Sequence, residues 1–246
     1  MSDEQSKTAL KHVTMYEITS KLFFHLCLSL ESSFHQKGKS VIEEGVCDFQ
    51  SDLMSTLLQT DKNKIDFQTD TLLDSEKVKQ SFKKYVEICK KNEQDPINMY
   101  SLMAKMFAHI AKHAKNNLGE PGQDAIIEGV RTFGEERGKN IAKRAELAGK
   151  PNEKDHYLTN YDMGRSELFE FETLFHKNEI EQTFTKCAFA DQWKEDGMEE
   201  HGILYCHMID PAVAKGFNPN FEVIHDEYIL KEGVCHFRFQ MKEDKK

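Results

Sequence analysis

The sequence predicts an α+β protein, with a helical N-terminal part followed by a small antiparallel sheet of two hairpins and an intervening helix. Two observations lead to this fold class. Apolar residues recur at helical spacing up to about residue 147, and from residue 168 onward short runs rich in Phe and Thr appear. With 246 residues, of which 39% are hydrophobic and 30% charged, the chain can form one large domain or two small ones.

The strongest signal in the helical part is an internal repeat at an offset of 84 residues. Of the 35 residues from 15 to 49, eleven are identical to their counterparts in 99–133. Met15-Tyr16, for example, recurs as Met99-Tyr100. Each copy is predicted to be one helix, a short turn and a second helix. The alternative is that these amphipathic helices share a composition without being copies.

The first copy is followed by less regular sequence. Residues 60–72 are mostly polar, and 74–92 have the spacing of an amphipathic helix. Residues 92–97, which include Pro96, are the expected linker between the copies. In the second copy, the helix predicted over 122–147 ends before Gly149-Lys150-Pro151.

The C-terminal third is predicted to be hairpin, helix, hairpin. The strand patterns are separated by turn residues at 176–179 and 231–233, and the helix is broken at Gly216-Phe217-Asn218-Pro219. We divide the chain into a helical region, which is a degenerate copy of the next helical pair, and a region expected to carry the chemistry. The predicted strands span 168–175, 180–189, 221–230 and 234–241. Helical spacing returns at Trp193 and then over 198–214, and the two regions are 1–95 and 96–246.

Composition excludes several function classes. The formal net charge is −9, and an acidic surface repels nucleic-acid backbones. The most apolar stretch, residues 22–30, is shorter than the ~20 residues that span a bilayer, and no signal-peptide core follows the polar start. We therefore expect a soluble, cytoplasmic protein that acts on a small molecule and binds neither nucleic acid nor membrane. Whether it forms a homo-oligomer is left open.

Three of the six cysteines fall in the C-terminal region, and none of the six forms a CxxC pair. Cys187 lies near the end of the second predicted strand, and Cys235 lies on the last strand, on the face that also carries Phe237 and Phe239. Cys206 is in the middle of the predicted helix. These thiols can be chemical groups or small buried hydrophobes.

The helix around Cys206 suggests a catalytic group. Cys206 and Asp210 are four residues apart, and His207 and Asp210 three apart, so all three can converge on one side of the helix. A thiol, an imidazole and a carboxylate can serve as nucleophile, general base and orienting group. A thiolate also binds metal ions, so a divalent metal is an open cofactor option.

A second marked stretch surrounds Arg137 in the long helix. Gly134 and Gly138 each weaken a helix, which predicts close approach of another backbone. Arg137 suits bidentate binding of a substrate carboxylate, and the alternative is an exposed ion pair with a nearby Glu. His25 and His109 are expected to be core histidines with satisfied hydrogen bonds.

His225 and His236 lie on the strands of the second hairpin. These histidines could bind a metal ion or could simply occupy partly exposed strand positions, and their spacing is compatible with both.

Five segments within roughly residues 99–241 follow one another in a pattern typical of a known family. They are Gly129-Val-Arg-Thr-Phe-Gly-Glu-Glu-Arg-Gly-Lys-Asn-Ile-Ala, Lys186-Cys-Ala-Phe-Ala-Asp-Gln-Trp-Lys-Glu-Asp-Gly, Leu204-Tyr-Cys-His-Met-Ile-Asp-Pro, Gly216-Phe-Asn-Pro and Gly233-Val-Cys-His-Phe-Arg-Phe. In this order they resemble the L-2-amino-thiazoline-4-carboxylic acid hydrolase family. The sequence departs from that pattern at Ala188, where the family's Cys-Pro-Phe-Ala motif has Pro.

The resemblance implies a hydrolase that opens a small ring at a C–S or C–N bond, as when 2-amino-thiazoline-4-carboxylate becomes N-carbamoyl-cysteine. It places Cys206 or Cys187 as the nucleophile or metal ligand, with Cys235 as the third thiol of the motifs. His207 then moves the proton, Asp210 orients it, and Arg137 holds the substrate carboxylate.

Two alternatives remain. The C-terminal region also resembles vinyl-reductase-type ligand-sensing domains, which would bind a small molecule or a metal without turnover. The chain could also be a degenerate family member whose cysteines only fill the core.

Overall fold

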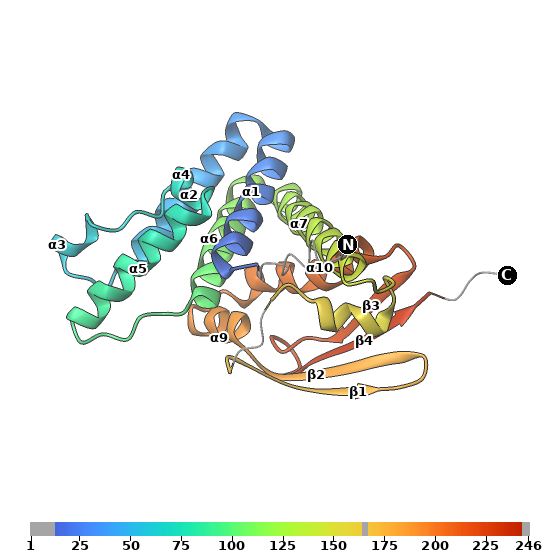
Figure 1. Ribbon diagram of the computed structural model, residues 1–246. Coiled ribbons are helices and arrows are strands. Elements are labelled where there is room, and N and C mark those ends of the chain that lie inside the picture. Colours follow the sequence, from blue (N-terminus) through green and yellow to red (C-terminus); the bar gives the residue numbers. More distant parts are fainter. Residues whose placement is uncertain (1–12, 164–166, 243–246) are drawn as a thin grey trace, which may run out of the picture.

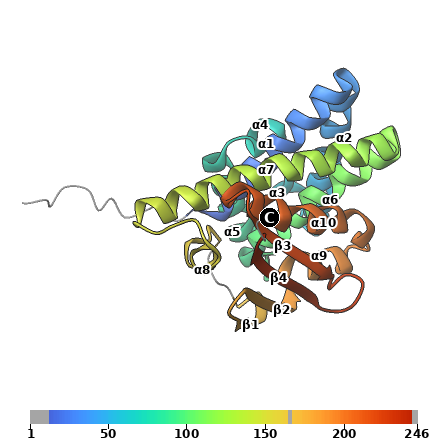
Figure 2. The same cartoon turned by 90° about the vertical axis from the view of Figure 1, so that its right-hand side faces the viewer.

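The computed structural model describes residues 13–163 and 167–242, and it has the predicted α+β class. Helices occupy the first part of the chain, and a four-stranded antiparallel sheet forms the last part (Figure 1). Figure 2 shows the long helix α7 (Glu120–Leu147) running across the molecule, with the sheet on one side of it.

The helical part contains two pairs of helices, and the first helix of each pair is 20 residues long. The breaks lie at His35 and Gly119, which have φ values of 50° and 68° and are 84 positions apart in the chain. α1 packs on α7, and α2 packs on α6, so the two pairs interlock. That the pairs are copies of one unit stays a prediction. Their bounds are α1 Met15–Phe34, α2 Gln36–Leu53, α6 Met99–Leu118 and α7 Glu120–Leu147.

Close backbone contacts recur at matching places in this interlock. A side chain at Gly45 would meet the Cα of Ile110 at 2.8 Å, and one at Gly129 would meet the Cα of Leu26 at 3.1 Å. Because these two glycines have no side chain, α2 can lie close to α6 and α7 can lie close to α1.

The segment between the pairs extends away from the sheet (Figure 1). α5 (Ser75–Lys91) matches the predicted amphipathic helix, and the Asp74 side chain caps it by accepting from the backbone of Glu76 and Lys77. The polar stretch before it contains two single-turn helices, α3 (Gln59–Lys62) and α4 (Thr69–Leu72).

Both predicted hairpins form, and they join into one sheet with the order β1-β2-β4-β3. The strands β2 and β4 pair antiparallel, so the second hairpin docks on the first. Two helices, α9 and α10, connect the hairpins where one was predicted, and residues 188 and 189, expected in the second strand, begin α9. The bounds are β1 Phe169–Phe175, β2 Glu179–Cys187, α9 Ala188–Glu195, α10 Glu199–Phe217, β3 Phe221–Glu227 and β4 Cys235–Met241.

The predicted close approach at the glycines of α7 is confirmed. A side chain at Gly134 would lie 2.7 Å from the Cβ of Ala212, and one at Gly138 would overlap the carbonyl of Val213. Both partners belong to α10, which also packs against β3. The glycines thus allow α10 to sit between α7 and the sheet.

A single cluster of buried hydrophobic side chains runs from Ile18 in α1 to Phe239 in β4. The division into regions 1–95 and 96–246 stays a prediction. Among the residues that the structure describes, no helix has the length and apolar character needed to cross a membrane.

Candidate functional site

A cavity of about 370 Å³ lies between the inner face of the sheet and α10. This volume suits a small organic ligand. The rest of its wall comes from the short helices α8 (Lys154–Tyr157) and η1 (Leu158–Asn160), two residues that follow η1, and one residue each of α7 and α9. The apolar and aromatic lining residues are Tyr157, Leu158, Tyr161, Met163, Phe169, Phe171, Phe175, Ile180, Phe184, Phe189, Tyr205, Ile209, Phe237 and Phe239.

The sheet supplies its part of the lining through strand alternation. Cys235, Phe237 and Phe239 share the inner face of β4 and are all buried, as the alternation predicts. On the paired strand β2, Ile180 lies opposite Phe239 and Gln182 opposite Phe237. Register therefore decides which sheet residues reach the cavity.

On α10, the structure brings together two of the three expected groups. Cys206 and Asp210 both line the cavity, one helical turn apart. His207 does not line it; its side chain is exposed, and its ring lies edge-on to Tyr228 with the centroids 4.8 Å apart. The next residue on a helix is rotated by about 100°, so the residue after Cys206 lies on a different side of α10 from the one that lines the cavity.

A different histidine takes the place next to Asp210. His225 of β3 lines the cavity, and its Nδ1 atom lies 4.0 Å from Oδ2 of Asp210. Its ring packs on the rings of Tyr228 and Phe237, with centroids 3.9 and 4.0 Å away. Neither ring nitrogen has a hydrogen-bond partner of normal geometry among the described residues.

Burial moves these two groups in opposite directions. It raises the pKa of Asp210 to about 6, although the Arg137 guanidinium partly offsets the rise. It lowers the pKa of His225 to about 4. At neutral pH Asp210 is therefore an ionised carboxylate in a largely aromatic cavity, and His225 is a neutral imidazole.

All three predicted thiols, Cys187, Cys206 and Cys235, reach the cavity. Burial raises the pKa of Cys187 to about 12 and that of Cys235 to about 11. The pKa of Cys206 lies well above its ordinary value for the same reason. The three are free cysteines, protonated at neutral pH, and a thiol is a weak nucleophile until it loses its proton.

Arg137 lines the cavity, and its hydrogen bonds go to Asp162, which was not among the predicted site residues. Nε donates to Asp162 over 2.9 Å and Nη2 over 2.6 Å, and both side chains are only 3% exposed. The structure contradicts the alternative of an exposed ion pair with a nearby Glu, and binding of a substrate carboxylate by Arg137 stays a prediction. Arg137 and Asp162 are 25 positions apart, so no local sequence pattern predicts that they form a pair.

Phenol groups also surround the cavity without having been predicted. Tyr157, Tyr161 and Tyr205 line it, and the hydroxyl of Tyr157 is buried with no hydrogen-bond partner among the described residues. Burial raises the pKa of all three, so each keeps its proton and can donate to a ligand.

The described residues contain no group of three or more His, Cys, Asp or Glu side chains arranged to hold a metal ion. His236 lies away from His225: its nitrogens contact Asp226 at 2.6 Å and Glu181 at 2.8 Å. The divalent metal stays a prediction.

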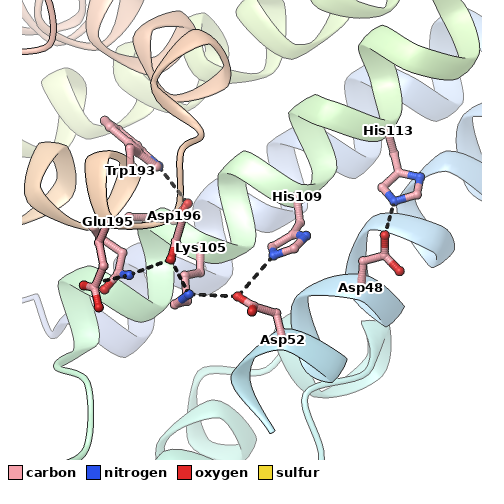
Figure 3. A network of polar contacts seen from close by, with 10 residues as sticks. Asp48, Asp52, Lys105, His109, His113, Trp193, Glu195 and Asp196 are labelled. Carbon is pink, nitrogen blue, oxygen red and sulfur yellow. Dashed lines mark hydrogen bonds and ion pairs between the residues drawn. The ribbon is translucent and has the colours of Figure 1, made fainter. Parts of the chain in front are cut away.

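A second polar cluster lies outside the cavity, where α9 meets the helical pairs (Figure 3). Lys105 of α6 contacts Asp52 at 2.8 Å and Asp196 at 2.6 Å, and Trp193 donates to the carbonyl of Ala104 over 2.9 Å. His109 contacts Asp52 at 3.4 Å. None of these residues lines the cavity, so we assign the cluster a structural role in holding α9 on α6.

The expectation for the core histidines is met at His25 and half met at His109. His25 contacts Thr132 at 2.9 Å and Glu136 at 2.8 Å, whereas Nδ1 of His109 has no partner in the described part of the chain.

Comparison with known proteins gives one family match. The model of the family described as L-2-amino-thiazoline-4-carboxylic acid hydrolase matches residues 99–239, from the start of α6 into β4. No curated protein matches the chain.

Two solved structures cover most of the chain with little similarity. One is a mutant of the Fe(II) unliganded H-NOX protein from K. algicida, at 9% identity and a TM-score of 0.28, covering 92% of this chain and 98% of that one. The other, described as "Modulating Heme Redox Potential Through Protein-Induced Porphyrin Distortion", has 14% identity, a TM-score of 0.25 and coverages of 93% and 99%. At these TM-scores neither contributes to the argument.

Proposed function

The chain belongs to the L-2-amino-thiazoline-4-carboxylic acid hydrolase family, and from this premise we propose that it hydrolyses the ring of a cyclic amidine in the cavity beneath α10. The proposal rests on one observation: the carboxyl group of Asp210 lines an aromatic cavity, and burial raises the pKa of Asp210 to about 6. A group that ionises close to neutral pH can both take and return a proton during one reaction.

The reaction adds one water across the C–S bond of a 2-aminothiazoline ring. Asp210 takes one proton from the water as the water oxygen bonds to C2, and the electron pair of the C2=N bond moves to that nitrogen. The nitrogen takes the remaining proton of the attacking water as the C2–O bond becomes a carbonyl, and the carbon expels the ring sulfur together with the C–S electron pair. Protonated Asp210 returns the proton to that sulfur, so the products are a urea and a free thiol. The return is favourable because a thiol has an ordinary pKa of about 8.5, above that of Asp210.

The neighbouring groups support this chemistry without changing charge. His225 is neutral at neutral pH and lies beside Asp210, where it can orient the water. The phenols of Tyr157 and Tyr205 keep their protons and can donate to the substrate. The largely aromatic lining makes the surroundings of these groups less polar than water, which strengthens electrostatic interactions between them.

The thiols are less suited to begin the reaction. Their raised pKa values leave very little thiolate at neutral pH. The prediction that Cys206 or Cys187 attacks as a thiolate therefore lacks electrostatic support, and we propose water as the nucleophile.

The test is release of free thiol from 2-amino-2-thiazoline and from L-2-amino-thiazoline-4-carboxylate, with the urea product identified by mass spectrometry. We expect turnover of at least one substrate by the wild type. We expect the same rate for Asp124→Asn, which makes the same change at an exposed position of α7. Asp210→Asn should be at least about 100-fold slower.

Two results would contradict the proposal: no turnover of either substrate by the folded protein, or wild-type turnover by Asp210→Asn. Binding without turnover would favour the ligand-sensing alternative. A parallel assay with a chelator tests the metal prediction. A loss that added divalent metal restores would support it, and unchanged turnover would contradict it.

A further inference from the structure

One guanidinium serves two carboxylates beside the cavity. Arg137 forms its bidentate pair with Asp162, and the same positive charge also lowers the pKa of Asp210. With Arg137 and both carboxylates ionised, these three side chains have a net charge of about −1 at neutral pH; Arg144, which does not line the cavity, also lowers the pKa of Asp162. No other Lys or Arg of residues 13–163 and 167–242 lines the cavity.

The guanidinium is also enclosed on its flat sides. Its carbon lies 5.5 Å from the centroid of the Phe133 ring and 5.4 Å from that of Tyr161. These cation–π contacts and the Asp162 pair fix Arg137 in place. Asp162 does not itself line the cavity, so it neutralises the charge of Arg137 without contacting a ligand in the cavity.

A ligand carboxylate would enter this environment at a disadvantage. It would lose its hydration in an aromatic cavity, meet the like charge of Asp210, and find Arg137 already paired. An uncharged or apolar substituent meets none of these costs, because most of the lining is Phe, Tyr, Ile, Leu and Met.

From this geometry we propose that the ligand carries an uncharged, mainly apolar substituent where the namesake substrate of the family carries its carboxylate, and that Asp162 sets this selectivity by holding Arg137. The choice of a cyclic amidine as the ligand's ring rests on the proposed function. The charge selectivity does not depend on turnover.

The test is calorimetric binding of a matched pair, L-2-amino-thiazoline-4-carboxamide and L-2-amino-thiazoline-4-carboxylate. The two differ in one charge and hardly in shape. We expect the wild type to bind the carboxamide at least about tenfold more tightly. Asp162→Asn frees the guanidinium and should move this ratio by at least about tenfold toward the carboxylate. Asp162→Glu keeps the negative charge and should retain the preference for the carboxamide.

A merely structural role of Asp162 would weaken both ligands equally and leave the ratio unchanged, which would overturn the assignment to Asp162. If Asp162→Asn does not fold, the double variant Arg137→Gln/Asp162→Asn takes its place, because it leaves no unpaired buried charge. It should keep the preference for the carboxamide. Tighter binding of the carboxylate by the wild type or by the double variant would overturn the proposal.

Benzamide and benzoate form a second matched pair that does not share the amidine ring. If neither thiazoline binds or turns over, the proposed function fails, and this pair still tests charge selectivity. Preference for benzamide would support the inference. Preference for benzoate, or binding of none of the four compounds, would overturn it.

Discussion

The Nδ1 atom of His225 lies 4.0 Å from the Oδ2 atom of Asp210, which joins β3 to α10 at the wall of the cavity. Burial raises the pKa of the carboxyl to about 6 and lowers the pKa of the imidazole to about 4. Between these two values both groups are uncharged, and above about pH 6 only Asp210 carries a charge. Titratable neighbours whose pKa values are moved apart in this way are typical of acid–base sites.

The pH dependence of turnover should follow Asp210. Because the carboxylate is the active form of the base, kcat/KM should rise with pH and level off above about 6. A pH–rate profile from 4.5 to 8.5 measures this. The rising limb should be present in Asp124→Asn and absent from the residual activity of Asp210→Asn. A limb shared by Asp210→Asn would assign the titration to the substrate or to another group.

Asp210→Asn should also stabilise the protein at neutral pH. A folded-state pKa of about 6 against an ordinary 3.8 means that the folded state binds this proton more tightly than the unfolded state. Asp210 therefore lowers the free energy of unfolding progressively from about pH 4 to pH 6, and the loss persists above. Removing the carboxylate should raise that free energy by up to about 3 kcal/mol at pH 7 and hardly at all at pH 4.

Urea unfolding at pH 4, 5, 6 and 7 checks both the size and the sign of this effect. His225 acts in the opposite sense: its lowered pKa means that stability is lost as pH falls from about 6.5 to about 4. The two slopes partly cancel in the wild type, so Asp210→Asn should show the histidine slope alone. A variant that is less stable than the wild type at pH 7 would contradict the burial argument.

The cavity thiols should be dispensable for the chemical step. Cys206→Ala removes the thiol one turn from Asp210, and we expect turnover within about fivefold of the wild type because Asp210 activates water directly. Cys47→Ala, at an exposed cysteine, is the matched control. Steady-state assays of both variants decide the point. A fall of Cys206→Ala to the level of Asp210→Asn would instead establish a covalent route through that thiol.

Local patterns were enough to predict much of this arrangement. The i, i+4 spacing placed Cys206 and Asp210 on one face of α10, and strand alternation placed Cys235 with the buried phenylalanines of β4. Gly134 and Gly138 predicted the close helix contact that places α10 between α7 and the sheet. Each of these signals acts within one element, where geometry follows from the sequence period.

What could not be predicted depends on contacts between elements. The spacing allowed His207 and Asp210 to lie on one side of α10. Which side of α10 lines the cavity depends on the position of the sheet, and that side includes Asp210 but not His207. Asp162 and His225 reach their partners only after α7, α10 and β3 have packed. A charged pair separated by 25 residues leaves no periodic trace in the chain.

The two lysines at the 84-residue offset allow a prediction in which one is the control for the other. Lys105 contacts Asp52 and Asp196 and is 11% exposed at its side chain, whereas Lys21 contacts Glu136 at 2.6 Å and is 42% exposed. Lys105→Met leaves Asp196, itself 11% exposed, without its cation, so we expect a loss of about 2–3 kcal/mol in the free energy of unfolding. Lys21→Met should cost less than about 1 kcal/mol, because solvent screens that pair and Glu136 keeps His25. Urea unfolding of both variants, with Asp196→Asn completing a double-mutant cycle for Lys105, measures the difference. Equal losses at the two lysines would show that the contact with α9 adds nothing, and the cluster in Figure 3 would then not be what holds α9 on α6.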